Sequence, residues 1–214
     1  LRVVCAASSH FCTAERQYRF PLEFASQRSP TAQWTVTGAG AALVSLDERD
    51  TPLARISRVC MGRVVDLGVT DANNMGAAMA PAAADTLLSL LTDTHTTPDD
   101  YDLIVTGDLG QVGHDLLCQL MREQRMALDE KRYVDCGLVI YDREAQDVHA
   151  GGSGCGCSAV TLSAALLPRL ASGDIGRMIF MATGALMSPT SSQQGESIPG
   201  IAHAVVLESP GRSA

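Results

Sequence analysis

The sequence is poor in lysine and in aromatic side chains. Lys131 is the only lysine among 214 residues, and the formal net charge is −8. The field of such a chain repels nucleic acid and anionic lipid, so neither is expected as a partner. Aromatic residues make up only 4% of the chain, so Ala, Val, Ile, Leu and Met must fill the core. That composition is typical of helices packed tightly on a sheet.

The chain also lacks the common cysteine motifs and a clear membrane or export signal. Its seven cysteines form no C-x-x-C pair and most lie inside apolar runs, which predicts buried thiols in a reducing compartment. Residues 1–8 are apolar but too short for a membrane span, and they lack the charged start of a signal peptide. We therefore expect a soluble chain without a transmembrane segment. Because it begins at Leu1 rather than Met, we expect a fragment or a trimmed chain.

Strand and helix patterns alternate along most of the sequence. Apolar runs at 2–7 and 33–44 predict strands, the second with a glycine kink. The polar, aromatic stretch between them, 8–32, either covers a site or forms a surface loop. The later strands are expected at 54–64, 103–106, 136–141, 177–182 and 201–207, and the helices at 77–91, 114–125 and 157–170. This order predicts an α/β fold in which helices cover both faces of a sheet.

The most informative stretch is His149-Ala-Gly-Gly-Ser-Gly-Cys-Gly-Cys-Ser158, which leads into an apolar helical pattern. Glycines remove Cβ atoms, so successive N–H groups can point at a ligand, and the following helix adds the positive end of its dipole. The stretch therefore predicts an anion site at a strand-to-helix turn. The alternative is that the glycines only allow helix and sheet to pack closely, with the cysteines as small core residues.

A second candidate binding element is the connection between the last two strands, residues 183–199. It is rich in hydroxyl, amide and turn residues. A loop of that length and polarity is a candidate binding loop, and the alternative is a plain surface connection.

Five sequence blocks resemble a known family over essentially the whole chain: residues 9–21, 30–40, 105–109, 149–159 and 183–203. By these blocks the chain resembles stage V sporulation protein AD of endospore-forming Firmicutes, which has a thiolase-like fold. The resemblance implies a complete C-terminal half in residues 51–214, with a mixed five-stranded sheet and helices on both faces. It places the last strands of the N-terminal half in residues 1–50. The family's preceding segment, which in true thiolases carries the nucleophilic cysteine, lies outside this chain.

The resemblance also implies a function. The family binds dipicolinic acid, a pyridine dicarboxylate that the developing spore takes up with calcium and releases on germination. The implied partners are dipicolinic acid and other stage V sporulation A membrane proteins, with a homodimer for the full-length protein. The implied location is soluble or peripheral at the spore inner membrane. No cofactor is implied apart from calcium carried with dipicolinate, which the ligand itself would mainly hold.

The catalytic residues of condensing enzymes with this fold are not evident in the sequence. Such enzymes need a thiolate and two His or Asn side chains that stabilise an oxyanion. The first of these positions reads Gly107-Asp-Leu-Gly110 and the second falls in the glycine-rich turn. We therefore predict a non-enzymatic binding protein, with a thiolase or ketoacyl-synthase type acyltransferase acting on acyl thioesters as the alternative. A purely architectural subunit that docks membrane partners is the third hypothesis.

Two histidines are candidate substitutes for the missing groups. His114 and His149 lie near the two replaced positions, but a lone histidine more often satisfies a structural contact. His203, inside the last apolar strand, is expected to be buried and hydrogen-bonded.

The predicted site contains no catalytic residue and no metal ligand. A planar dicarboxylate needs N–H and hydroxyl donors at both ends, which the glycine-rich turn and the polar loop supply. Asp108 joins the site as a carboxylate that, like water, can complete the open coordination positions of calcium carried by the ligand. The alternative is a turn residue or a cap of the next helix. The predicted ligand-binding residues are Gly152, Ser153, Gly154, Cys155, Gly156, Ser158, Ser188, Thr190, Ser191 and Asp108.

Overall fold

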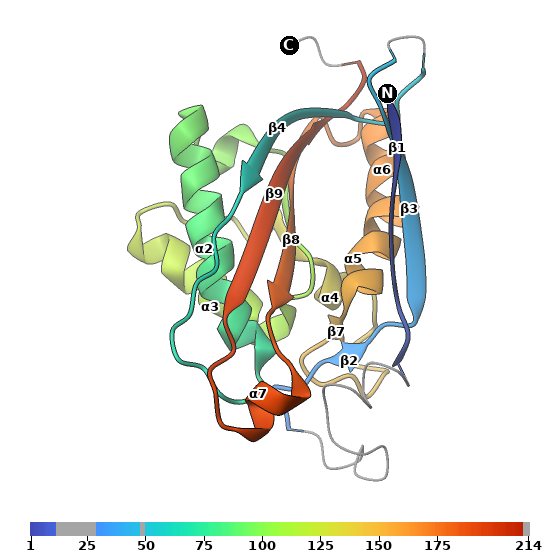
Figure 1. Ribbon diagram of the computed structural model, residues 1–214. Coiled ribbons are helices and arrows are strands. Elements are labelled where there is room, and N and C mark those ends of the chain that lie inside the picture. Colours follow the sequence, from blue (N-terminus) through green and yellow to red (C-terminus); the bar gives the residue numbers. More distant parts are fainter. Residues whose placement is uncertain (12–28, 48–49, 212–214) are drawn as a thin grey trace.

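The computed structural model describes residues 1–11, 29–47 and 50–211 (Figure 1). Three sheets organise them. A mixed sheet has the strand order β4-β9-β8-β5-β6, β1 pairs with β3, and β2 pairs with β7. The five-stranded sheet consists of β4 (Arg55–Met61), β5 (Leu103–Thr106), β6 (Tyr133–Asp135), β8 (Arg177–Ala185) and β9 (Gly200–Glu208). The predicted mixed five-stranded sheet is therefore confirmed.

The centre of this sheet is apolar on both faces. β5 runs parallel to both β6 and β8, while β9 is antiparallel to β8 and β4. All four residues of β5, Leu-Ile-Val-Thr, are buried. A continuous apolar run is what a parallel strand covered on both faces requires.

Two helices, α2 (Met75–Thr94) and α3 (Gly110–Glu123), cover one face of the sheet. Five of the eleven buried residues of α2 are alanine, and these small side chains bring its axis close to its neighbours. Where α2 crosses α3, a Cβ added to Gly76 would lie 2.8 Å from the backbone N of Gly113. Small residues at this crossing explain how a core poor in aromatic residues reaches close packing.

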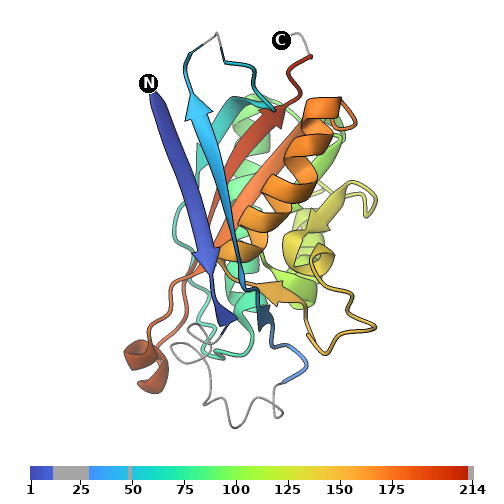
Figure 2. The ribbon, with the colours of Figure 1, turned by 90° about the vertical axis from the view of Figure 1, so that its right-hand side faces the viewer.

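The opposite face meets a helical segment made of α5 (Cys155–Thr161), a π-helical turn η3 (Leu162–Leu166) and α6 (Leu167–Ser172). On its other side this segment contacts the ribbon of β1 (Arg2–Ser9) and β3 (Gly38–Ser45). Figure 2 shows the ribbon lying beside the helix. A Cβ on Gly40 would lie 2.9 Å from Ser163 Oγ, so the glycines of the second predicted strand let β3 approach the helix.

The structure differs from the sequence prediction in three places. The expected strand 136–141 is the helix α4 (Cys136–Val139), because the Asp135 side chain caps it by accepting from Gly137 N–H. The expected strand 33–44 is split into β2 (Trp34–Thr35) and β3. The connection 183–199 contains a short helix, α7 (Pro189–Gln193). Most of the polar, aromatic stretch, residues 12–28, lies outside the described residues.

Two helical stretches, Met75–Thr94 and Cys155–Ser172, are long and apolar enough for a membrane span by length and composition. This is weak evidence, because the core helix of a soluble protein passes the same test. Most of the first stretch is buried inside the protein.

Candidate functional site

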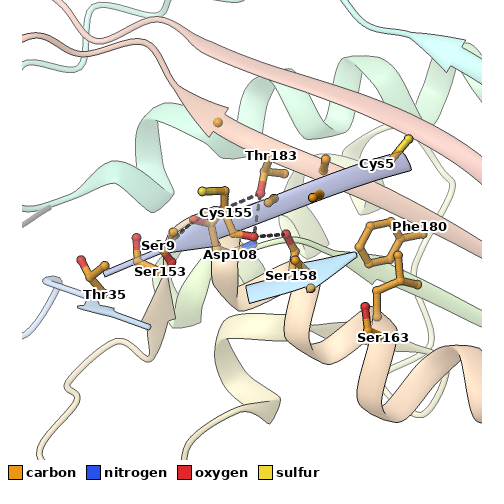
Figure 3. Close-up of a pocket in the computed structure, with 18 of the residues that line it drawn as sticks. Cys5, Ser9, Thr35, Asp108, Ser153, Cys155, Ser158, Ser163, Phe180 and Thr183 are labelled. Atoms are coloured by element: carbon orange, nitrogen blue, oxygen red, sulfur yellow. Dashed lines mark hydrogen bonds between the residues drawn. The ribbon is translucent and has the colours of Figure 1, made fainter. Parts of the chain in front are cut away.

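A cavity of about 610 Å³ lies between the β1–β3 ribbon, the helical segment and β8. Figure 3 shows the side chains that surround it. Its apolar wall includes Met79, Leu162 and Phe180. Its polar wall consists of one carboxylate, several hydroxyl groups and one thiol, contributed by Asp108, Ser9, Thr35, Ser153, Ser158, Ser163, Thr183 and Cys155.

The glycine-rich turn forms one end of the cavity. It is a strand-to-helix turn, as predicted: β7 (Gly152–Ser153) pairs in parallel with β2, and α5 begins at Cys155. Gly154 has φ of 100°, and a Cβ on Gly156 would lie 2.5 Å from Gly38 O. Close packing thus accounts for Gly156, whereas Gly154 also needs a backbone conformation that favours glycine.

Two N–H groups of this turn donate to side chains of the protein itself. Gly154 N–H donates to Asp108 Oδ2 over 2.8 Å, and Gly156 N–H donates to Ser9 Oγ over 2.9 Å. The carboxylate that accepts from the turn in this structure is therefore a side chain of the chain itself. A ligand carboxylate at Gly154 would have to displace Asp108.

Asp108 connects the turn to the five-stranded sheet. Its Oδ1 accepts from Thr183 Oγ1 over 2.8 Å, and its backbone carbonyl accepts from Gln33 Nε2 over 2.7 Å. Its side chain is 9% exposed. Asp108 is not a side-chain cap of α3, whose N-cap residue is Leu109 without a side-chain hydrogen bond.

A second carboxylate, Asp135, lies behind Asp108 and does bind the start of α3. It accepts hydrogen bonds from Thr106 Oγ1 (2.7 Å), Leu109 N–H (2.8 Å), Gly110 N–H (2.9 Å) and Gly137 N–H (3.0 Å). Asp135 is fully buried. Helix N-termini stabilise negative charge, so one carboxylate secures the start of both α3 and α4.

Burial raises the pKa of Asp135 to about 7. The hydrogen bond from Thr106 opposes that rise, and the negative charge of Asp108 adds to it. Desolvation therefore dominates over hydrogen bonding at this group.

The cysteines differ in accessibility. Cys136 and Cys157 are buried, as predicted, and burial raises the pKa of both thiols above its ordinary value, which makes them poor nucleophiles. Cys5 and Cys155 are exposed, so the expectation of buried thiols is wrong for them. The Cys155 thiol donates to Ser8 O over 2.9 Å and lines the cavity.

The histidines make structural contacts outside the cavity. His114 stacks on Tyr133 with ring centroids 4.5 Å apart, and His149 Nδ1 lies 2.7 Å from Ser29 O. His203 Nδ1 accepts from Gly62 N–H, but the side chain is exposed, so the prediction of burial was wrong. Strand alternation places His203 on the face of β9 that points away from α2.

The cavity contains only some of the predicted residues. Asp108, Ser153, Gly154, Cys155 and Ser158 line it. Gly152 and Gly156 belong to the same turn but are not among the lining residues. Ser188, Thr190 and Ser191 belong to α7 and its N-cap, outside the lining; Ser188 and Thr190 are exposed and Ser191 is half-buried.

The α7 hydroxyls serve the helix itself. Ser188 Oγ accepts from Ser191 N–H over 3.1 Å, and the Ser191 side chain returns a bond to the Ser188 backbone. This reciprocal capping box uses the groups that the sequence offered as ligand donors.

The residues that sequence reasoning missed are Ser9, Thr35, Ser163 and Thr183. A signal existed for Thr183, because it ends the apolar run of β8 and β8 is the parallel neighbour of β5. Polar groups at the carboxyl ends of parallel neighbours gather at one edge of a sheet. Within the described ranges, no group of three His, Cys, Asp or Glu side chains is arranged to hold a metal ion.

The fold belongs to the thiolase-like class. An acetyl-CoA acetyltransferase from Syntrophomonas wolfei matches with a TM-score of 0.51 and 14% identity, covering 84% of this chain and 39% of that chain. A 3-oxoacyl-[acyl-carrier-protein] synthase III from Aquifex aeolicus VF5 matches with a TM-score of 0.49 and 11% identity, covering 97% of this chain and 57% of that chain. Likeness at this identity concerns the fold and not the chemistry.

Within that class, the chain belongs to the stage V sporulation protein AD family. The family's sequence model matches residues 1–208. Stage V sporulation protein AD of Bacillus subtilis (strain 168) is 48% identical over 210 residues, which cover 98% of this chain and 61% of that protein. Family membership supports a role in sporulation. The chain spans about three fifths of the length of this relative.

Proposed function

We propose that this chain is part of a non-catalytic protein that binds dipicolinic acid, alone or as its calcium chelate. It would serve dipicolinate uptake into the developing spore and release in germination. Membership of a sporulation family supports the biological setting. The observation that carries the proposal is a cavity of about 610 Å³ with hydroxyl groups along an apolar wall.

The chemistry of the wall suits a flat, rigid dicarboxylate. Ser153, Ser158 and Ser163 present hydroxyl groups that can donate to carboxylate oxygens, while Phe180 and Leu162 provide apolar surface for an aromatic ring. A ligand with charged ends and a planar middle needs both kinds of contact.

One feature argues against acyl transfer. No histidine is found among the described residues that line the cavity. A condensing enzyme needs an activated thiolate and groups that stabilise an oxyanion at the same place.

The negative charge of Asp108 affects the two forms of the ligand differently. A free dianion meets a carboxylate in the wall, whereas the calcium chelate carries no net charge. Both forms are therefore part of the test. Other stage V sporulation A membrane proteins, homodimerisation and a peripheral location at the spore inner membrane are further proposals, supported by family membership alone.

The test is calorimetry of dipicolinate binding to the full-length protein, with and without calcium, beside pyridine-2-carboxylate as a ligand with one carboxylate. Saturable binding of dipicolinate, at least tenfold tighter than that of the monocarboxylate, supports the proposal. A parallel assay follows thiol release from acyl thioesters, and turnover there would favour the acyltransferase alternative. Absence of dipicolinate binding in either form would favour an architectural subunit.

A further inference from the structure

Asp108 and Asp135 hold opposite sides of one backbone turn. On the cavity side, Asp108 binds Gly154 N–H and Thr183 Oγ1. On the core side, Asp135 binds the N–H groups of the next two residues, Leu109 and Gly110. The position of Asp108 therefore depends on hydrogen bonds made by a carboxylate that is not among the residues lining the cavity.

We propose that Asp135 is a positioning residue for the cavity: its ionised carboxylate holds Asp108 against the glycine-rich turn, and its protonation releases Asp108 and strengthens binding of an anionic ligand. This inference rests on the proposed function for the identity of the ligand. Ligand affinity at that site would therefore depend on pH.

The surroundings of Asp135 favour uptake of a proton close to neutral pH. The titratable groups that face it are Asp108, Tyr133 of β6, Cys136 of α4 and Cys157 of α5. On the α3 side, His114 stacks on the Tyr133 ring. The negative charges of Asp115 and Cys118 raise the pKa of Tyr133. None of the four groups facing Asp135 is a cation, and burial raises the pKa of Asp135 to about 7.

Protonation changes the hydrogen bonds in a definite way. Three N–H groups and one hydroxyl now converge on the two oxygens of Asp135. Thr106 Oγ1 can reverse and accept from the new O–H, because Tyr133 OH can take its proton. The three N–H groups then donate to a neutral carboxyl group, and such bonds are weaker than bonds to a carboxylate. The backbone of residues 108–110 is then held less firmly, and Gly154 N–H becomes available to a ligand carboxylate. Loss of a nearby negative charge acts in the same direction.

The first arm of the test needs no ligand. Amide resonances of Leu109, Gly110 and Gly154 are followed by NMR from pH 5.5 to 8.5 in the full chain and in Asp135→Asn. A common midpoint for all three amides, absent from the variant, supports the proposal. A Gly154 amide that stays unchanged while Leu109 and Gly110 titrate would overturn it.

A second variant covers the case in which Asp135→Asn does not fold. Thr106→Val removes a hydrogen bond that lowers the pKa of Asp135, so the shared midpoint should move to higher pH. An unchanged Gly154 midpoint in a folded Thr106→Val protein would overturn the proposal. Asp174→Asn, an exposed aspartate, is the matched control and should leave the midpoint in place.

The second arm measures dipicolinate affinity at pH 6 and pH 8, a range in which ordinary carboxyl groups remain ionised. We expect at least fivefold tighter binding at pH 6 and a ratio near one in Asp135→Asn. Equal affinities at pH 6 and pH 8 in the unmodified chain would overturn the proposal that Asp135 regulates dipicolinate binding. If Gly154 follows Asp135 but dipicolinate binds at neither pH, the positioning role stands and the proposed function fails.

Discussion

At the scale of single residues, Asp135 makes folding sensitive to pH. Its pKa is about 7 in the folded chain, against an ordinary value of 3.8. Between these values the folded chain binds one more proton than the unfolded chain, so the free energy of unfolding falls as the pH rises. From about pH 4 to about pH 7 the loss is on the order of 4 kcal/mol.

Urea unfolding at several pH values tests this dependence. Asp135→Asn has no proton to exchange at this position, so its free energy of unfolding should decline much less over the same range. Asp174→Asn should keep the slope of the unmodified chain. Equal slopes for the unmodified chain and Asp135→Asn would contradict a raised pKa.

Gly154 and its neighbour Cys155 separate backbone from side-chain roles in the turn. A Cβ on Gly154 would lie 2.9 Å from Ser9 Oγ, at a φ of 100° that side chains rarely adopt. Gly154→Val should therefore disturb the turn and abolish dipicolinate binding, whereas Cys155→Ser keeps the size and the backbone and should bind nearly as well. Calorimetry on both variants decides the matter, and the opposite ranking would point to chemistry at the Cys155 thiol.

Thr183 and Ser188 test which hydroxyl groups belong to the site. Thr183 binds Asp108 inside the cavity, while Ser188 caps α7 outside the lining. Thr183→Val removes a bond that holds Asp108, so it should strengthen binding of the dipicolinate dianion by at least tenfold, since a hydrogen bond to a charged group contributes roughly 1.5–3 kcal/mol. Ser188→Ala should mainly loosen α7, at about 1 kcal/mol. A larger change of affinity in Ser188→Ala than in Thr183→Val would restore α7 to the site.

At the scale of elements, the close crossing of α2 and α3 depends on two glycines, Gly76 and Gly113, which face each other. A Cβ on Gly76 would meet Leu109 O at 2.5 Å, whereas a Cβ on Gly184 would meet only Ile201 Cγ2, at 3.5 Å. Gly76→Ala should lower the free energy of unfolding by about 1–3 kcal/mol, because the helices must separate. Gly184→Ala is the matched control in β8 and should change it by no more than about 0.5 kcal/mol. Chemical denaturation measures both.

The elements that sequence predicted well are those with long periodic patterns. The strands at 103–106, 177–182 and 201–207 and the helix at 77–91 agree with β5, β8, β9 and α2 within a few residues. The short apolar run 136–141 was misassigned, because such a run suits a buried strand or a helix equally well. What decided it was the Asp135 cap, which depends on how the turn after β5 meets β6.

The site was harder to predict than the fold. The glycine-rich turn and Asp108 could be found because their local sequence is unusual. Ser9 and Thr183 reach the same cavity from strands that lie far apart in the sequence. Their convergence is a property of the sheet stacking, which local patterns do not contain.

At the scale of the whole molecule, the β1–β3 ribbon is the least supported part. It is a two-stranded sheet with exposed Val3, Val4 and Leu43. Such ribbons are marginal in water, and their open edges favour aggregation. We expect a protein extended to the relative's full length to melt at a higher temperature than this chain and to aggregate less. Identical thermal unfolding would contradict the assignment of residues 1–50 to a separate half.

The pairing of β2 with β7 gives the molecule an internal optical reporter. Trp34, the single tryptophan of the chain, pairs with Gly152 and stacks on Phe11 with ring centroids 4.3 Å apart. Its fluorescence therefore reports on the attachment of the first strands to the glycine-rich turn, while far-ultraviolet circular dichroism reports mainly on the helices. If the ribbon detaches first on heating, the emission of Trp34 will change at a lower temperature than the dichroism, and a coincidence of the two curves would indicate one cooperative unit.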